Sequence, residues 1–213
     1  MILVLDLEIT PDYRYLGPEI ARLLPAETEY RVFVDDPALP DLDAYDGIVL
    51  SGSTATVFDD EYAAWVEPAE RLVRRCRDRS VPLLGICFGH QLAHQALGGT
   101  VETDQRRATF VEMTADESDE VLAGVEPIVP VLHADLVVEP ADELVTTART
   151  DYNDHFCSRH DDAPLWTVQF HPEFTERVED RPSDWDRGGR TFAESTATRV
   201  LENFAARCDE RRS

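Results

Sequence analysis

Short apolar runs along the chain predict the strands of a buried sheet. Residues 2–5 and 81–86 are apolar without polar alternation, the pattern of a strand that is covered on both faces. A third run, 46–50, ends at the turn-like segment Ser51-Gly52-Ser53. Further strands are expected at 30–34 and 165–170, with weaker strand-like runs at 110–113, 128–132 and 144–147.

Helical spacing occurs between and after these runs. Five apolar residues from Trp65 to Cys76 are spaced i, i+4, i+7, i+8 and i+11, so they share one face of a helix, and Pro68 fits its first turn. The same spacing from Ala193 to Phe204 predicts a closing helix. Two more helices are expected over residues 18–24 and from residue 87 to the helix-ending pair Gly98-Gly99.

Strands that alternate with helices predict an α/β fold, with a mostly parallel sheet and helices on both of its faces. No linker divides the chain, so a single domain is expected over residues 1–213. Residues 177–189 contain Pro182 and two glycines and are interpreted as a polar surface loop. The pattern assigns that loop no role.

The charge of the chain is unusual. Its 213 residues carry a formal net charge of −23, and every basic residue is Arg. Such a field repels nucleic acid phosphates and anionic lipids, which argues against both as partners. An acidic surface that docks a basic protein is one interpretation. Because the acidic residues are spread along the whole chain, the sequence favours the other, a halophilic protein whose charges are screened in a salt-rich cytoplasm.

Neither a membrane-spanning helix nor a disulfide framework is expected. No apolar run approaches the roughly 20 residues of a membrane-spanning helix, and the first residues lack a basic leader, so a cytoplasmic location is predicted. The cysteines are isolated, and their spacing fits no zinc site. At most one of them should be chemically active. The four are Cys76, Cys87, Cys157 and Cys208.

Cys87 stands where a nucleophile would be presented. Gly85-Ile86-Cys87-Phe88-Gly89 has the form G-x-nucleophile-x-G between a predicted strand and a predicted helix, the context of a nucleophile elbow. Cys87 would project from the carboxyl edge of the sheet, at a helix N-terminus that favours thiolate over thiol. The alternative is a small buried cysteine in a glycine-rich turn.

A second segment supplies a base. His171-Pro172-Glu173 follows the predicted strand 165–170. Residues two apart in an extended segment point to the same side, so His171 and Glu173 can face one cleft as a base and its orienting carboxylate. This is the arrangement that activates a cysteine nucleophile.

Together these segments resemble the class I (triad) glutamine amidotransferases. The resemblance rests on residues 85–92 and 170–173, on residues 48–53 at the place of the family's oxyanion loop, and on His133-Ala134-Asp135-Leu136-Val137, which is similar to its His-x-Asp-x-Val segment. It is closest to the glutaminase domains of the guanosine monophosphate synthase type and their free-standing relatives, and it implies a flavodoxin-like fold.

The resemblance implies a hydrolase of the glutamine side-chain amide. Cys87 would attack the γ-carbonyl to form a glutamyl thioester, His171 would transfer the proton, and Glu173 would orient the imidazole. Backbone N–H groups of Gly52 and Phe88 would form the oxyanion hole. The implied substrate-binding residues are Gln91, Ser53, His133 and Asp135. No metal or organic cofactor is required by this chemistry, and the substrate is glutamine or another γ-glutamyl compound.

Two departures from the family pattern bear on function. Residues 6–12 replace the usual Tyr-Gly-Gln-type segment, and the oxyanion loop is Ser-Gly-Ser rather than Ser-Gly-Gly-Pro. Both resemble free-standing members. Three hypotheses stay open: a glutaminase that supplies ammonia to a separate synthetase, a self-sufficient γ-glutamyl hydrolase or peptidase, and a catalytically silent regulatory protein. The intact Cys87, His171 and Glu173 argue against the third.

Overall fold

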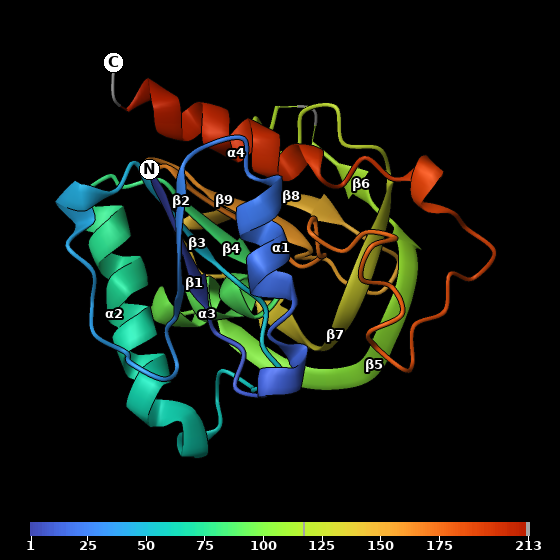
Figure 1. The fold of residues 1–213 in the computed structure, drawn as a ribbon, viewed down its shortest axis with the longest axis horizontal. Coiled ribbons are helices and arrows are strands. Elements are labelled where there is room, and N and C mark those ends of the chain that lie inside the picture. The colour runs from blue at the N-terminus through green and yellow to red at the C-terminus, as the bar shows by residue number, and fades with distance from the viewer. Residues whose placement is uncertain (117, 212–213) are drawn as a thin grey trace.

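An eight-stranded sheet forms the centre of the computed structural model, which describes residues 1–116 and 118–211 (Figure 1). Its strand order is β2-β1-β3-β4-β10-β9-β8-β6. The strands are β1 (Ile2–Asp6), β2 (Thr28–Val32), β3 (Gly47–Leu50), β4 (Leu83–Ile86), β6 (Thr114–Ala115), β8 (Leu144–Arg149), β9 (Cys157–His160) and β10 (Leu165–Val168). The helices are α1 (Leu16–Leu23), α2 (Ala63–Asp78), α3 (Phe88–Ala96) and α4 (Arg199–Glu210).

The first part of the sheet is parallel. Strands β2, β1, β3, β4 and β10 pair in parallel, and β9, β8 and β6 continue the sheet in antiparallel fashion. The parallel order is the flavodoxin-like order, with β10 as the fifth strand. The predicted α/β fold with a mostly parallel sheet is therefore confirmed.

Helices cover both faces of the sheet, because successive side chains of each strand point to opposite sides. Leu3 and Leu5 of β1 belong to the apolar cluster that includes α2 and α3. Ile2 and Val4 belong to the cluster that includes α1 and α4. An uninterrupted apolar run is thus what a strand between two helical layers requires, as the sequence predicted.

A separate two-stranded sheet consists of β5 (Thr100–Glu112) and β7 (Ile128–Glu139), which curve beside the main sheet (Figure 1). Of this two-stranded sheet, the sequence predicted only the runs 110–113 and 128–132. The missed part of β5 is mostly polar because residues 102–106 are exposed, and its pairing with β7 shifts register between Thr103 and Arg107. A solvated strand with an irregular register carries no clear period-two signal.

Two helix starts differ from the predictions. Helix α2 begins at Ala63, directly after the 3-10 turn Asp60–Tyr62, so Pro68 lies in its second turn and not in its first. Helix α4 begins only at Arg199. Ala193 lies instead in the 3-10 turn Phe192–Glu194, which has a capping box between Thr191 and Glu194. Local capping at Thr191 therefore prevails over the apolar spacing.

No helix in the described residues is long and apolar enough to cross a membrane.

Helix α3 carries two histidines that are buried against the sheet. His90 Nδ1 lies 2.8 Å from Oγ1 of Thr167, and His94 Nε2 lies 3.1 Å from Oγ of Ser158. The backbone N–H of Ala141 donates to Nδ1 of His94 at 3.3 Å. Burial lowers the pKa of His94 to about 3 and lowers the pKa of His90 well below its ordinary value. Both rings are therefore neutral in the folded protein at neutral pH.

We expect these histidines to make the fold sensitive to acid. The unfolded chain binds a proton on each ring near pH 6.5, whereas the pKa of folded His94 is about 3. The contribution of His94 is complete above about pH 6.5 and falls towards pH 3, by roughly 1.4 kcal/mol per pH unit, and His90 acts in the same direction. Urea unfolding between about pH 7 and about pH 5 measures this slope. His94→Gln should flatten it, and an unchanged slope would contradict the assignment.

Candidate active site

The turn between β4 and α3 presents Cys87 in a strained conformation. Its φ is 52° and its ψ is −102°, a region that costs a residue with a side chain about 1–3 kcal/mol. The backbone N–H of Cys87 donates to Val168 O at 2.8 Å, and its carbonyl accepts from the N–H groups of His90 and Gln91. The bonds to β10 and to the first turn of α3 therefore hold the strained residue in place.

The two flanking glycines allow the backbones around Cys87 to approach closely. A Cβ at Gly85 would lie 2.4 Å from the carbonyl oxygen of Gly89, and a Cβ at Gly89 would lie 2.6 Å from that of Leu50. Both contacts are with backbone atoms, which cannot move away by rotation as a side chain can. The G-x-C-x-G pattern is thus a packing requirement of this turn.

His171 and Glu173 form a buried pair just after β10. Nδ1 of His171 lies 2.7 Å from Oε1 of Glu173, and neither side chain is more than 3% exposed. The backbone N–H of His171 donates to Pro130 O on β7 at 2.9 Å. Burial alone would lower the pKa of His171, but the negative charges of Glu173 and of a Cys87 thiolate raise it. The carboxylate of Glu173 therefore stabilises a positive charge on this imidazole.

The loop after β3 lies against both Cys87 and His171. A Cβ at Gly52 would stand 2.8 Å from Cε1 of His171 and 3.5 Å from Cβ of Cys87, so only a glycine leaves this space free. Within the described residues, neither the N–H of Gly52 nor that of Phe88 has a hydrogen-bond partner. Phe88 is the first residue of α3, whose initial N–H groups have no partner inside the helix.

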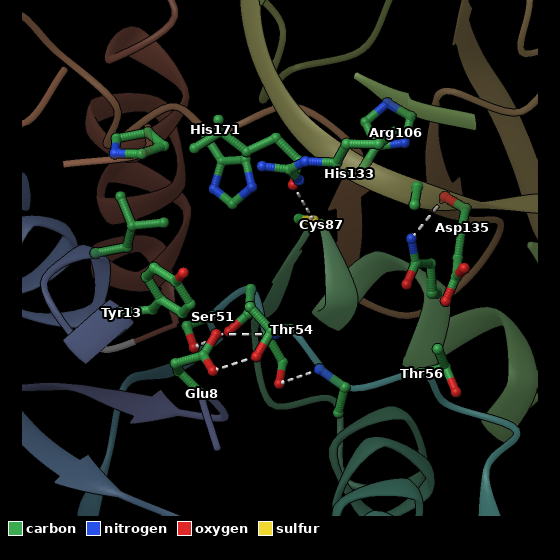
Figure 2. Close-up of a pocket in the computed structure, with 18 of the residues that line it drawn as sticks. Glu8, Tyr13, Ser51, Thr54, Thr56, Cys87, Arg106, His133, Asp135 and His171 are labelled. Carbon is green, nitrogen blue, oxygen red and sulfur yellow. Dashed lines mark hydrogen bonds between the residues drawn. The ribbon is translucent and has the colours of Figure 1, made fainter. Parts of the chain in front are cut away.

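A cavity of about 500 Å³ opens around Cys87. Figure 2 shows Cys87 near its middle, with Asp135 and Thr56 on one side and Tyr13 and Glu8 on the other. Of the residues predicted from the sequence, the lining includes Cys87, His171, Gly52, Ser53, Gln91, His133 and Asp135. The other two lie outside the lining: Glu173 is behind His171, and the Phe88 side chain packs on Trp65 with ring centroids 5.4 Å apart.

Gln91 and Asp135 are coupled on one side of the cavity. The amide Nε2 of Gln91 donates to the backbone carbonyl of Asp135 at 2.9 Å and to Oε1 of Gln169 at 3.3 Å. Burial raises the pKa of the Asp135 carboxyl. The Gln91 amide N–H groups are thus occupied by the protein, which fixes the position of its side chain within the cavity wall.

His133 and its neighbour Leu132 contact the site from β7. The thiol of Cys87 donates to the carbonyl of Leu132 across 3.8 Å, a weak contact. Nε2 of His133 lies 3.0 Å from the Tyr152 hydroxyl, and the guanidinium of Arg107 lies 3.8 Å from the centroid of the Tyr152 ring. Burial lowers the pKa of His133 to about 3, so this ring is neutral.

The opposite side of the cavity contains residues to which the sequence assigned no role. Asp6 is the last residue of β1, and Glu8, Tyr13 and Tyr15 follow it on the way to α1. In the sequence, only the place of these residues just after a strand points to a role in the site, because ligands of parallel sheets bind at the carboxyl ends of strands. The sequence marks residues 6–12 as a departure from a family pattern and gives no individual role to any of them.

The loop 177–189 is more than a polar surface segment. Pro182, Ser183 and Asp184 line the cavity, and Asp184 forms an ion pair with Arg106 of β5 at 2.9 Å. Trp185 packs among three phenylalanine rings with centroid distances of 4.6–6.1 Å; they are Phe110, Phe174 and Phe192. Trp185, the one aromatic residue of this mostly polar stretch, therefore anchors the loop beside the site.

Among the described residues, no group of three or more His, Cys, Asp or Glu side chains is arranged to hold a metal ion.

The sequence and the fold are similar to those of known proteins. A family model described as glutamine amidotransferase class-I matches residues 21–182. A glutamine-hydrolyzing GMP synthase subunit from Methanopyrus kandleri is 36% identical over 142 residues, which are 61% of this chain and 63% of that protein. The protein of the same name from Pyrococcus abyssi is 28% identical over 204 residues, 92% of this chain and 89% of that one.

A solved structure shows the same fold. The glutamine amidotransferase from Thermotoga maritima superposes with a TM-score of 0.78 at 15% sequence identity, over 99% of this chain and 97% of that one. The alignment with the Methanopyrus protein spans less than two thirds of that protein's length.

Proposed function

Because the chain belongs to the class I glutamine amidotransferase family, we propose that it hydrolyses the side-chain amide of glutamine through Cys87, His171 and Glu173. The observation that carries this proposal is the strained Cys87 at the N-terminus of α3, beside a buried imidazole whose Nδ1 lies 2.7 Å from a buried carboxylate. These are the parts that an activated cysteine nucleophile needs.

In the first half-reaction, the Cys87 sulfur attacks the γ-carbonyl carbon of glutamine. His171 takes the thiol proton and passes it to the departing nitrogen, so that ammonia leaves and a glutamyl thioester remains. Water, deprotonated by His171, then cleaves the thioester to glutamate and restores the thiol. Glu173 keeps the Nδ1 proton of His171 in place and stabilises the imidazolium.

The oxyanion that develops on the γ-carbonyl oxygen would be bound by the N–H groups of Gly52 and Phe88. Their lack of partners among the described residues supports this role, since donors already engaged would gain little in the transition state. Loss of one such donor typically costs ~2.7–4 kcal/mol of transition-state stabilisation.

The amino-acid end of the substrate is assigned to the side of the cavity that contains Gln91, Asp135, Ser53 and His133. Gln91 is fixed by Asp135 and Gln169, and this rigidity favours precise positioning of a small polar ligand.

We further propose that the ammonia is used by a separate synthetase. This rests on the two relatives, each of which is named as one subunit of a glutamine-hydrolyzing GMP synthase. A partner of this kind would have to bind where ammonia leaves the cavity, so that the product does not equilibrate with solvent first.

The first test is ammonia release from glutamine by the purified chain in molar potassium chloride, with a parallel incubation with a glutamine-like affinity label. Rapid turnover supports the hydrolase and favours one that is active alone. A rate near zero with Cys87 labelled supports a glutaminase that depends on its synthetase. If neither turnover nor labelling is observed, the result contradicts the proposed function and favours a catalytically silent protein.

A further inference from the structure

The loop after β3 is attached to the segment after β1 by hydrogen bonds on both sides of Gly52. Before Gly52, Oγ of Ser51 accepts from the backbone N–H of Leu7 at 2.9 Å. After Gly52, both the N–H and the hydroxyl of Thr54 donate to the Glu8 carboxylate. Figure 2 shows Glu8 beside Ser51 and Thr54. The loop is therefore held from the same side at two points.

The Glu8 carboxylate is the attachment point after Gly52. Its Oε2 accepts from the N–H of Thr54 at 2.8 Å, and its Oε1 accepts from the Thr54 hydroxyl at 2.6 Å. Oε1 also accepts from the N–H of Thr10 at 2.7 Å. Hydrogen bonds to an ionised acceptor are roughly twice as strong as those between neutral groups. Because two groups of one residue are bound, the direction of the backbone at Thr54 is fixed.

Glu8 is itself held in place. Its N–H donates to Oδ1 of Asp6 at 2.9 Å, and its carbonyl accepts from Nε of Arg14 at 2.9 Å. Asp6 is the last residue of β1, and its Oδ2 accepts from the Tyr30 hydroxyl at 2.6 Å. Oγ of Ser51 lies 3.3 Å from Oδ1 of Asp6. Two carboxylates therefore connect the end of β1 to the loop.

This arrangement opposes burial. Asp6 is 1% exposed and Glu8 is 6% exposed, and burial raises the pKa of both carboxyls. Within the described residues, the hydrogen bonds to both carboxylates come from neutral N–H and O–H groups. A buried charge without a cationic partner costs stability. Groups kept at such a cost occur preferentially at functional sites.

The residue between the two attachments faces the reacting atoms. A Cβ at Gly52 would lie 2.8 Å from Cε1 of His171 and 3.5 Å from Cβ of Cys87. The N–H of Gly52 has no hydrogen-bond partner among the described residues, so no bond of its own fixes its direction. That direction depends on Ser51 and Thr54. Its use as an oxyanion donor rests on the proposed function.

The contact joins the two segments in which the sequence departs from the family pattern. Residues 6–12 include Glu8, and Thr54 stands where the Ser-Gly-Gly-Pro form of the loop has proline. Proline fixes φ through its ring and has no N–H to donate. With Thr54 in this place the loop lacks that restraint, and the hydrogen bonds to Glu8 supply another.

We propose that Glu8 is a positioning residue of the glutamine reaction, which acts through Thr54 to direct the N–H of Gly52 at the developing oxyanion. Asp6 supports it by holding Glu8 and Ser51. Neither carboxylate contacts the reacting atoms. An oxyanion is present only in the transition state and the tetrahedral intermediate, so misdirection of this N–H lowers kcat and leaves KM nearly unchanged.

Glu8→Gln is the main test, because it keeps the size of the side chain and replaces one acceptor oxygen by an NH₂ group. We expect kcat for glutamine to fall at least about tenfold, less than the roughly 100-fold to 1000-fold loss of a whole oxyanion donor. KM should stay within about twofold. The matched control is Glu70→Gln, a carboxylate of α2 that accepts from Nε2 of Gln95 at 3.0 Å, and it should keep the wild-type kcat.

A double-mutant cycle tests whether Glu8 acts through Thr54. Thr54→Val removes the hydroxyl that donates to Oε1 and should also lower kcat. Combined with Glu8→Gln, it should lower kcat by less than the product of the two single factors, because both substitutions break one contact. Effects that simply multiply would contradict action through Thr54.

A pair of alkylating agents separates positioning from general disruption of the site. Iodoacetamide loses iodide as the sulfur attacks its CH₂ carbon, so no oxyanion develops. In a chloroketone analogue of glutamine, the ketone oxygen gains negative charge as the sulfur adds. In Glu8→Gln, the ratio of chloroketone to iodoacetamide labelling of Cys87 should fall at least about tenfold. This ratio needs no turnover, so it can be measured even where the chain alone is slow.

Three results would overturn the inference and leave the proposed function standing. An unchanged kcat and labelling ratio would show that Glu8 does not act on the site. Equal loss with both alkylating agents would show a structural role only. A rise in kcat would show that Glu8 acts through its charge, which opposes the negative charge of the oxyanion. If the wild type neither cleaves glutamine nor is labelled at Cys87 by the chloroketone, the proposed function and this inference both fail.

Discussion

Cys87→Ala is expected to reduce the rate of glutamine hydrolysis by at least about a thousandfold and to leave the fold intact. The substitution removes the nucleophile and keeps Cβ, so the backbone of the elbow needs the same φ of 52° as before. The only hydrogen bond of the sulfur among the described residues, to Leu132 O, is a weak approach of 3.8 Å. Ammonia release and a urea unfolding curve measure the two effects separately.

The other thiols provide matched controls. Cys76 is buried in α2, and burial raises its pKa to about 12, so it is not a thiolate at neutral pH. Cys76→Ala should therefore keep the wild-type rate, although it removes a buried sulfur as well. If Cys87→Ala retained a rate near that of Cys76→Ala, Cys87 would not be the nucleophile.

Glu173→Gln is expected to lower kcat by about 100-fold to 10,000-fold, with little change in the volume of the site. The carboxylate accepts the Nδ1 proton of His171, which leaves Nε2 free to take the proton of the thiol. A glutamine side chain can present its NH₂ group to Nδ1 instead, and this stabilises the wrong tautomer. The loss should appear in kcat rather than in KM, because Glu173 does not line the cavity.

The same substitution has a second readout. The charge of Glu173 is a cause of the raised pKa of His171, so its removal should lower that pKa. An NMR titration of the His171 ring would then show the proton leaving at a lower pH in Glu173→Gln than in the wild type. Because Oε2 of Glu173 has no hydrogen-bond partner among the described residues, neutralising it breaks only the Oε1 contact. An unchanged titration would mean that Glu173 supports His171 sterically.

The catalytic candidates could be predicted because their signals are local. The G-x-C-x-G pattern reflects close backbone contacts within one turn, and His171 and Glu173 are two residues apart in one segment. The buried strands could be predicted for a similar reason, since strands such as β1 face apolar layers on both sides and have no polar alternation.

The rest of the site depends on contacts between distant segments. Glu8 meets Thr54 across 46 residues, and Arg106 meets Asp184 across 78. Charged residues at such positions have no periodic signal, and their roles appear only when the chain is folded. The exposed part of β5 was missed because a polar strand has no clear hydrophobic periodicity. The start of α4 was placed too early because a local cap is a weaker sequence signal than the apolar spacing that begins at Ala193.

The placement of the tryptophans gives the molecule an internal optical reporter. Trp65 and Trp166 lie in the two apolar clusters on opposite faces of the sheet, where their surroundings are fixed. Trp185 lies in the loop whose neighbouring residue, Asp184, lines the cavity. A ligand that displaces water near this loop should therefore change the emission of one indole and leave the other two constant. With Trp185→Phe as the blank, binding could be followed by intrinsic fluorescence without a label on any cysteine.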